Sequence, residues 1–277
     1  MIRITEDFIS LPSRDNITNN GAEGHVLIIG GDVGMCGAAA FAAEAAYRSG
    51  CGLVRIYTHP DNRIPVQSLV PEAVLSFWEH GIDTPILDSC LEWADAVVIG
   101  VGFGMGDIQK KLLRKVISSC SVPFVIDADA LNILSLHKSL LTHLSSNVVL
   151  TPHLGELSRL TGLEISEIKQ NTLTVLRDKF DGINIAAKSS QTYVRLSDGV
   201  EYVSESGDSS LSTGGAGDIL SGMIASFIAQ RMPIEKALPY AVYLHGKAGA
   251  FAGSKYGVRS VIARDVISSI SEVLKEY

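Results

Sequence analysis

Residues 25–48 read HVLIIGGDVGMCGAAAFAAEAAYR, and this stretch decides the fold class. After its first residue the run His25–Ile29 is entirely aliphatic, which predicts a buried strand. Glycines end the strand, and the alanine-rich segment Cys36–Arg48 predicts a helix. A strand that turns directly into a helix is the first half of a βαβ unit, so the pattern favours a parallel sheet.

Similar short apolar runs recur along the chain, each followed by glycine, proline or a polar turn. They are residues 53–57, 96–99, 123–126, 147–150 and 183–187. Helical spacing of apolar residues also appears at Asp107–Ser119 and at residues 164–180. Strands that alternate with helices predict a parallel sheet that is covered on both faces.

The last third of the chain has a different pattern. Residues 193–196 and 201–203 flank the turn Ser197-Asp198-Gly199 and predict an antiparallel hairpin. Helices are expected after it, at about residues 218–230, 234–252 and 263–275. Because no internal repeat or low-complexity linker divides the chain, residues 1–277 are expected to form one α/β domain.

The composition excludes several classes of protein. Hydrophobic residues make up 46% and charged residues 19%, which excludes a disordered chain. Thirty acidic against 23 basic residues give a net charge of −7, so nucleic acid is not expected as a partner. The N-terminus MIRITEDFISLPSRD lacks a signal-peptide run and no 18-residue apolar window occurs, so we expect a cytoplasmic protein that does not bind membranes. The four cysteines form no Cys-x-x-Cys pair and are expected to be buried free thiols.

The strongest chemical signal is STGGAGD at residues 212–218, directly before an apolar helix. Three glycines in four positions let backbone N–H groups converge, and a helix N-terminus adds unpaired donors and a positive dipole end. These features predict an anion hole that holds a transferring phosphoryl group; it consists of Gly214, Gly215, Ala216 and Gly217. Asp218 is then predicted to be the general base, although aspartate is also an ordinary residue at a helix start, and both interpretations are compatible.

Two further glycine clusters follow predicted strands. GGDVGMCGA at residues 30–38 departs from the G-x-G-x-x-G spacing, and no acidic residue ends the next strand to hold a ribose. An ordinary NAD-dehydrogenase site is therefore a poor match. GVGFGMG at residues 100–106 fits either a close backbone approach to a ligand or only a tight turn.

Polar residues follow two other predicted strands. TPHLGE at residues 151–156 places His153 and Glu156 at the carboxyl edge of the sheet, where open α/β sheets bind ligands. The alternatives are a solvated histidine and a glutamate that caps the next helix. Asp127 and Asp129 have a spacing suited to a magnesium water shell or to ribose hydroxyls. The alternative is that Asp129 only caps the next helix.

Taken together, these segments resemble the ribokinase-like superfamily and, within it, the ADP/ATP-dependent NAD(P)H-hydrate dehydratases. The resemblance runs from about Gly24 to Ile270 and rests on ordered motifs. They are GGDVGMCGA with the downstream RSGCGLVRI, GVGFG, IDADALNIL, LTPHLGEL, STGGAGDILSGMIA and YLHGKAG. The resemblance implies an α/β fold of ribokinase-like type, a three-layer α/β/α sandwich with a mainly parallel central sheet.

The function that the resemblance implies is repair of hydrated nicotinamide cofactors. A nucleotide would phosphorylate the ring hydroxyl of NADHX or NADPHX (S epimer), and elimination of phosphate would restore NADH or NADPH. The enzyme would be a carbon–oxygen lyase that uses ADP or ATP as co-substrate and forms a homotetramer. Magnesium is expected from phosphoryl-transfer chemistry, with no residue assigned as its ligand.

The resemblance also assigns binding residues one by one. Positions that contact the hydrated dinucleotide match Ala38, Gly102, His153 and Asp218. Positions that contact the adenine nucleotide match Lys188, Ser189, Ser190, Gln191, Thr192 and Gly217. The family usually has Leu-Lys-Gly-Ala where this chain has Ala187-Lys188-Ser189-Ser190. If the position requires a positive φ, Ser189 costs on the order of 1 kcal/mol, and weaker nucleotide binding is predicted.

Many relatives carry an N-terminal epimerase domain and are about twice as long. Residues 1–277 are therefore expected to be a single dehydratase domain without an epimerase domain, and any epimerase would be a separate chain. Two alternatives stay open at this point. One is a small-molecule kinase of the same superfamily, of the hydroxymethylpyrimidine or hydroxyethylthiazole type, and the other is a silent nucleotide-binding protein.

Overall fold

The computed structural model describes residues 1–11, 23–78 and 84–277, so part of the N-terminal stretch discussed above lies outside the described residues. In this part of the chain the strands form one ten-stranded sheet in the order β1-β10-β9-β8-β7-β6-β5-β2-β3-β4. The strands are β1 (Ile2–Arg3), β2 (His25–Ile29), β3 (Leu53–Thr58), β4 (Val74–Phe77), β5 (Ala96–Ile99), β6 (Phe124–Ile126), β7 (Val148–Leu150), β8 (Asn184–Ala187), β9 (Thr192–Arg195) and β10 (Glu201–Ser204).

Eleven α-helices and four short 3-10 turns connect the described strands. The helices are α1 (Cys36–Arg48), α2 (Arg63–Leu69), α3 (Thr84–Trp93), α4 (Asp107–Ser119), α5 (Ala128–Leu136), α6 (Leu154–Thr161), α7 (Ile165–Gln170), α8 (Thr172–Lys179), α9 (Ala216–Ala229), α10 (Ile234–Tyr256) and α11 (Ala263–Leu274). The 3-10 turns are η1 (Glu6–Phe8), η2 (Pro60–Asn62), η3 (Lys138–His143) and η4 (Ser209–Leu211).

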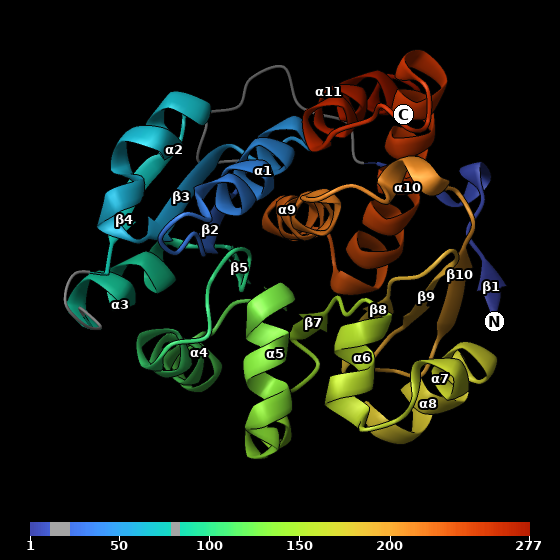
Figure 1. Cartoon of the computed structure of the whole chain (residues 1–277), viewed down its shortest axis with the longest axis horizontal. Coiled ribbons are helices and arrows are strands. Elements are labelled where there is room, and N and C mark those ends of the chain that lie inside the picture. The colour runs from blue at the N-terminus through green and yellow to red at the C-terminus, as the bar shows by residue number, and fades with distance from the viewer. Residues whose placement is uncertain (12–22, 79–83) are drawn as a thin grey trace.

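The sheet separates two layers of helices. Neighbouring strands from β4 across to β8 run parallel, whereas β9 pairs antiparallel with both β8 and β10. Figure 1 shows α1, α9, α10 and α11 on one side of the sheet and α4 to α8 on the other. Each side has its own hydrophobic core, and alternate residues of a strand such as β2 enter opposite cores. The expected three-layer α/β/α sandwich with a mainly parallel sheet is therefore confirmed.

The alanine-rich helix α1 is an interior element. Six of its alanines are buried, and they let α9 approach so closely that a Cβ at Gly222 would lie 2.1 Å from the Ala42 carbonyl oxygen. The Ser226 hydroxyl donates a hydrogen bond to the Ala46 carbonyl oxygen across this contact. Small residues in this stretch are thus explained by helix packing within the chain, and they place the start of α9 next to α1.

Several sequence predictions needed correction. The single helix expected over residues 164–180 is wrong, because the chain breaks at Asn171 (φ −135°, ψ 34°) into α7 and α8. Asparagine favours such a break because its side chain competes for backbone hydrogen bonds and so disfavours a helix interior.

The prediction for the cysteines is correct only in part. All four are free thiols, but only Cys51 and Cys90 are buried, whereas Cys36 and Cys120 are half-buried. No helix in the described ranges combines the length and apolarity needed to cross a bilayer.

Candidate active site

The loops that follow the parallel strands meet at one edge of the sheet. The Gly31 N–H donates to the Val101 carbonyl oxygen (2.9 Å) and joins the glycine cluster after β2 to the cluster after β5. The Lys188 N–H donates to the Pro152 carbonyl oxygen (2.8 Å) and joins the ends of β8 and β7. This is the edge at which open α/β sheets bind ligands. The motifs singled out in the sequence therefore lie around one site.

The glycine loop forms the N-terminus of α9. Gly215 has a φ of +95°, which favours glycine, and a Cβ there would lie 2.6 Å from the Phe41 ring. A Cβ at Gly214 would have no neighbour within 4 Å, so the backbone is open on that side. The first N–H groups of a helix lack intrahelical partners and bind anions. The loop therefore has a geometry that can bind an anion. Anion binding by residues 214–217 stays a prediction.

An ion pair between the buried Asp127 and the half-buried Lys188 lies directly against this loop. The Lys188 ammonium is 2.8 Å from Asp127 Oδ1, and the Ser221 hydroxyl donates to Asp127 Oδ2 at 2.7 Å. Burial alone raises the pKa of Asp127, but the charge and hydrogen bond of Lys188 outweigh it, and the pKa lies below its usual value. A Cβ at Gly217 would be 3.0 Å from Lys188 Nζ. The cation therefore stands at the glycine loop, where negative charge would develop.

Asp218 lies in the first turn of α9 and is the predicted base. Burial raises its pKa to about 7, and the negative charge of Asp127 adds to this effect while Lys188 opposes it. A carboxyl group with this pKa is half ionised near neutral pH, which suits it to accept a proton and to release it again. The electrostatic environment thus supports the predicted role.

The pH dependence follows from this pKa. A base must be ionised, so kcat/KM is expected to rise about tenfold per pH unit below 7 and to level off above it. Measurement of initial rates from pH 5 to 9 checks this result. A profile that is flat down to pH 5 contradicts a base with a raised pKa.

Thermal unfolding over the same pH range is the control. Asp218 and Glu156 both bind protons more tightly in the folded state than when unfolded, because burial raises each pKa to about 7. Their contribution to stability is therefore present at low pH and is lost as the pH rises from about 4 to 7. Activity and stability are expected to change in opposite directions across this interval, so the loss of activity at acid pH is not unfolding.

His153 and Glu156 form the N-terminal cap of α6. His153 Nδ1 accepts hydrogen bonds from the backbone N–H groups of Gly155 (2.9 Å) and Glu156 (3.3 Å), and Glu156 Oε2 accepts from the His153 N–H at 2.8 Å. Because Nδ1 is an acceptor, the neutral ring carries its proton on Nε2. Burial and the nearby Lys188 charge lower the pKa of His153 and favour this neutral form. The capping alternative is confirmed for Glu156. The His153 side chain is half-exposed, and its Nε2 atom lies 3.4 Å from Glu156 Oε1.

The other predicted substrate positions lie together beside the first glycine cluster. Gly102 has a φ of +53°, and a Cβ there would lie 2.9 Å from the Ala38 Cβ. Nearby, Asp129 Oδ2 accepts a hydrogen bond from the Gly104 N–H (2.8 Å), so Asp129 clamps the β5 loop. The alternative that Asp129 caps α5 is wrong: Asp129 lies in the first turn of α5 and bonds Gly104, whereas Asp127 holds the N-cap position but its side chain makes no cap hydrogen bond.

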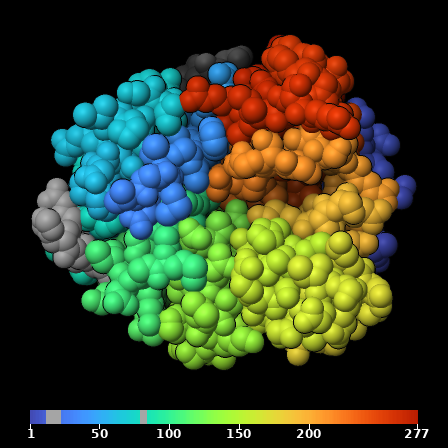
Figure 2. Space-filling view, in the orientation of Figure 1, coloured from blue at the N-terminus to red at the C-terminus, as the bar shows by residue number. Residues whose placement is uncertain are grey.

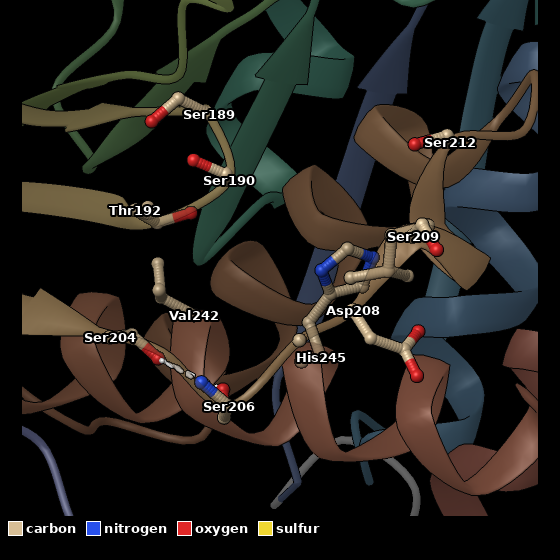
Figure 3. Close-up of a pocket in the computed structure, with 13 residues that line it drawn as sticks. Ser189, Ser190, Thr192, Ser204, Ser206, Asp208, Ser209, Ser212, Val242 and His245 are labelled. Atoms are coloured by element: carbon tan, nitrogen blue, oxygen red, sulfur yellow. Dashed lines mark hydrogen bonds between the residues drawn. The ribbon is translucent and has the colours of Figure 1, made fainter. Parts of the chain in front are cut away.

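The segment 188–192 forms the turn between β8 and β9 beside a cavity of about 390 Å³. Figure 2 shows a recess where the orange segment of the glycine loop meets the ochre hairpin. Three of the six predicted nucleotide-binding residues, Ser189, Ser190 and Thr192, line the cavity, as Figure 3 shows. The Gln191 side chain instead donates to Glu205 and accepts from the Tyr193 hydroxyl. Ser189 is not among the described residues with positive φ, so the expected backbone strain is absent.

Sequence reasoning missed two features of this edge. The first is Ser221, which lies one turn beyond Asp218 on α9 and donates a hydrogen bond to Asp127. Its i+3 spacing from Asp218 places both side chains on one face of the helix and could have indicated this role. His245 on α10 lines the cavity; it was visible only as part of YLHGKAG. Within the described residues no group of three or more His, Cys, Asp or Glu side chains is arranged to hold a metal ion.

A three-layer sandwich with a glycine loop at a helix N-terminus, and with a lysine and a carboxyl group beside that loop at the carboxyl edge of the sheet, belongs to the ribokinase-like class of folds. The chain belongs to the NAD(P)H-hydrate dehydratase family, because the sequence model of that family matches residues 26–272. This confirms the family expected from the motifs and leaves the small-molecule kinase alternative with less support.

Individual relatives support membership of this family. The chain is 37% identical over 262 residues to a bifunctional NAD(P)H-hydrate repair enzyme of Coxiella burnetii, covering 94% of this chain and 52% of the relative. It is 32% identical to an ADP-dependent (S)-NAD(P)H-hydrate dehydratase of Neisseria meningitidis, covering 95% and 88%. A crystal structure of a ribokinase-like superfamily protein from Enterococcus faecalis superposes with a TM-score of 0.88 at 27% identity, covering 100% and 96%. The chain spans about half the length of the bifunctional relatives.

Proposed function

We propose that this chain is a nucleotide-dependent NAD(P)H-hydrate dehydratase that converts the S epimer of NADHX or NADPHX to NADH or NADPH. The single observation that carries the proposal is Asp218, a half-buried carboxyl group with a pKa of about 7 at the start of α9. It stands beside an open glycine loop and the Lys188 ammonium in a chain of the dehydratase family. Relatives named as ADP-dependent dehydratases support the choice of nucleotide.

The proposed chemistry has two steps. In the first step, Asp218 accepts the proton of the substrate's ring hydroxyl, and the hydroxyl oxygen attacks the terminal phosphorus of ADP or ATP. The bond to the leaving nucleotide breaks, which releases AMP from ADP or ADP from ATP. The N–H groups of residues 214–217 and the Lys188 ammonium stabilise the negative charge. In the second step the C–O bond breaks, phosphate leaves with the oxygen, and a proton lost from the neighbouring ring carbon restores the double bond. Phosphorylation thus turns a poor leaving group into a good one.

The proposal includes several properties beyond the reaction. Magnesium would neutralise phosphate charge when it arrives with the nucleotide. Because the described residues offer no cluster of metal ligands, we assign no protein ligand to it. We also propose a cytoplasmic, homotetrameric enzyme in which residues 1–277 act as one dehydratase domain. Exposed apolar side chains near the end of α10, including Phe251 and Tyr256, support contacts between subunits.

Recovery of absorbance near 340 nm tests the proposed reaction, because the reduced ring absorbs there and its hydrate does not. The protein is mixed with NADHX, Mg²⁺ and either ADP, ATP or no nucleotide. Recovery only with nucleotide supports the proposal and identifies the preferred co-substrate. If no absorbance returns but a hydroxymethylpyrimidine or hydroxyethylthiazole is phosphorylated, the kinase alternative is correct.

Two substitutions at His153 separate its cap from its N–H donor. The amide oxygen of Asn in His153→Asn replaces Nδ1 as the cap acceptor, whereas His153→Gln places an amide nitrogen near Nε2 and loses the cap. We expect His153→Asn to unfold like the wild type in urea but to raise KM for NADHX about tenfold or more. His153→Gln is expected to lose about 1 kcal/mol of stability with a smaller rise in KM. Equal KM values for His153→Asn and the wild type contradict a donor role.

A further inference from the structure

A buried histidine on the wall of the cavity has an unused nitrogen. His245 lies on α10 and only 7% of its surface is exposed. Its Nε2 atom is buried and has no hydrogen-bond partner among the residues that the structure describes. Nearly all buried polar atoms in proteins are paired, because an unpaired one loses its hydration without compensation. A ligand in the adjoining cavity would supply the partner.

The position of His245 links it to the glycine loop. The ring lies close enough to the backbone of Ala216, the first residue of α9, for that backbone to act on its pKa. Figure 3 shows the ring rising from α10 toward the segment that carries Ser209 and Ser212, across the cavity from Ser189 and Ser190. His245 is therefore held where a molecule bound to the glycine loop would extend into the cavity.

The cavity has the chemistry of a nucleoside site and not of a phosphate site. Its described lining contains no Lys or Arg side chain; Asp208 is its one acidic residue, and most of the rest are hydroxyl residues. The lining residues with hydroxyl groups are Ser189, Ser190, Thr192, Ser204, Ser206, Ser209 and Ser212. A carboxylate without a cation repels phosphate, whereas hydroxyls match the uncharged donors and acceptors of a sugar or a base. The cation of this edge, Lys188, lies instead at Gly217.

The protonation state of His245 suits the same ligand. Burial, helped by the charge of Lys188, lowers the pKa of the imidazole to about 4. At neutral pH the ring is therefore uncharged, with one donor and one acceptor nitrogen. A neutral ring gives a directional hydrogen bond to an uncharged group and adds no attraction for phosphate.

We propose that His245 binds the nucleoside part of the nucleotide through Nε2 and determines much of the affinity for it. The inference rests on the proposed function, in which an adenine nucleotide is the co-substrate. It assigns His245 to binding: the phosphates lie at residues 214–217 and Lys188, and the nucleoside lies against α10 in the cavity. The ring does not take part in proton transfer.

Binding measurements on three variants test this inference. His245→Phe keeps the ring volume and removes the nitrogen, His245→Gln keeps a polar atom near Nε2, and His143→Phe is the control at an exposed histidine on η3. Titration calorimetry is carried out with ADP, adenosine and inorganic pyrophosphate, and thermal unfolding is recorded without ligand. We expect His245→Phe to weaken ADP and adenosine binding about 10- to 30-fold, to leave pyrophosphate binding unchanged and to keep a Tm near that of His143→Phe. His245→Gln is expected to stay within about threefold of the wild type and serves alone if His245→Phe does not fold.

Two results would overturn the inference. If ADP affinity is unchanged in His245→Phe, or falls by the same factor as pyrophosphate affinity, the ring only supports α9 through Ala216. If His245→Phe instead loses stability but keeps its affinity, the histidine is structural. Failure of the wild type to bind ADP at all would refute the nucleotide requirement of the proposed function, and this outcome is separate from a defect confined to the variant.

Discussion

Replacement of Asp218 by asparagine is expected to lower kcat about 10³-fold or more while ADP still binds. Asparagine has nearly the same shape, but its amide does not accept the hydroxyl proton, and a general base typically contributes about 10²- to 10⁴-fold. Because burial of the charged form raises the pKa of Asp218, removal of the charge is expected to preserve or increase the Tm. Single-turnover rates at 340 nm and the Tm of each protein measure these effects.

The matched control is Asp107→Asn. Asp107 also lies in the first turn of a helix, α4, so its replacement removes the same favourable interaction with the helix dipole away from the glycine loop. We expect Asp107→Asn to retain full activity. If Asp218→Asn is as active as this control, Asp218 is only a first-turn residue and the account of the base is wrong.

Replacement of Lys188 by methionine is expected to destabilise the protein by about 3–5 kcal/mol, because it leaves Asp127 buried without its cation. The double variant Lys188→Met with Asp127→Asn is expected to recover most of this loss, since asparagine still accepts from Ser221 and is uncharged. Lys188 also lowers the pKa of Asp218, so the single variant is expected to need a higher pH for activity. Urea unfolding of both variants and the pH–rate profile test these statements.

A lysine in a surface ion pair provides the comparison. Lys275 is 2.7 Å from Glu272 and 68% of its side chain is exposed, so Lys275→Met is expected to cost less than about 1 kcal/mol. If Lys188→Met lowers the free energy of unfolding by no more than Lys275→Met does, the ion pair between Lys188 and Asp127 does not stabilise the fold. If the double variant is less stable than the single one, Asp127 is not the group left uncompensated.

The sequence predicted the parts of the fold that local patterns determine. The bounds of β2, β5, α1 and α4 agree with the predicted ranges, because each is a regular apolar pattern that ends at glycine or a polar turn. Short elements at the sheet edge, such as β1 and β4, escaped prediction. Their pairing with β10 and β3 is a tertiary contact that two to four residues do not signal.

The site shows the same division between local and tertiary information. Glycine spacing and the following helix predicted a site at residues 214–217 and Asp218, and these residues form the N-terminus of α9. The pairing of Lys188 with Asp127 was not predictable, because the two residues are 61 positions apart and meet only through the sheet. Similarly, the orientation of Gln191 away from the cavity depends on Glu205 and Tyr193, which the turn brings beside it.

An isotope measurement tests the central claim, phosphorylation of the ring hydroxyl followed by elimination, most directly. NADHX carrying ¹⁸O in its ring hydroxyl is converted with ADP or ATP and Mg²⁺, and the inorganic phosphate and the water are analysed by mass spectrometry. Because the C–O bond breaks after the oxygen has been phosphorylated, we predict one ¹⁸O-labelled phosphate for each NADH formed. Label that appears in water, with unlabelled phosphate, would contradict the account and show that the hydroxyl leaves without being phosphorylated.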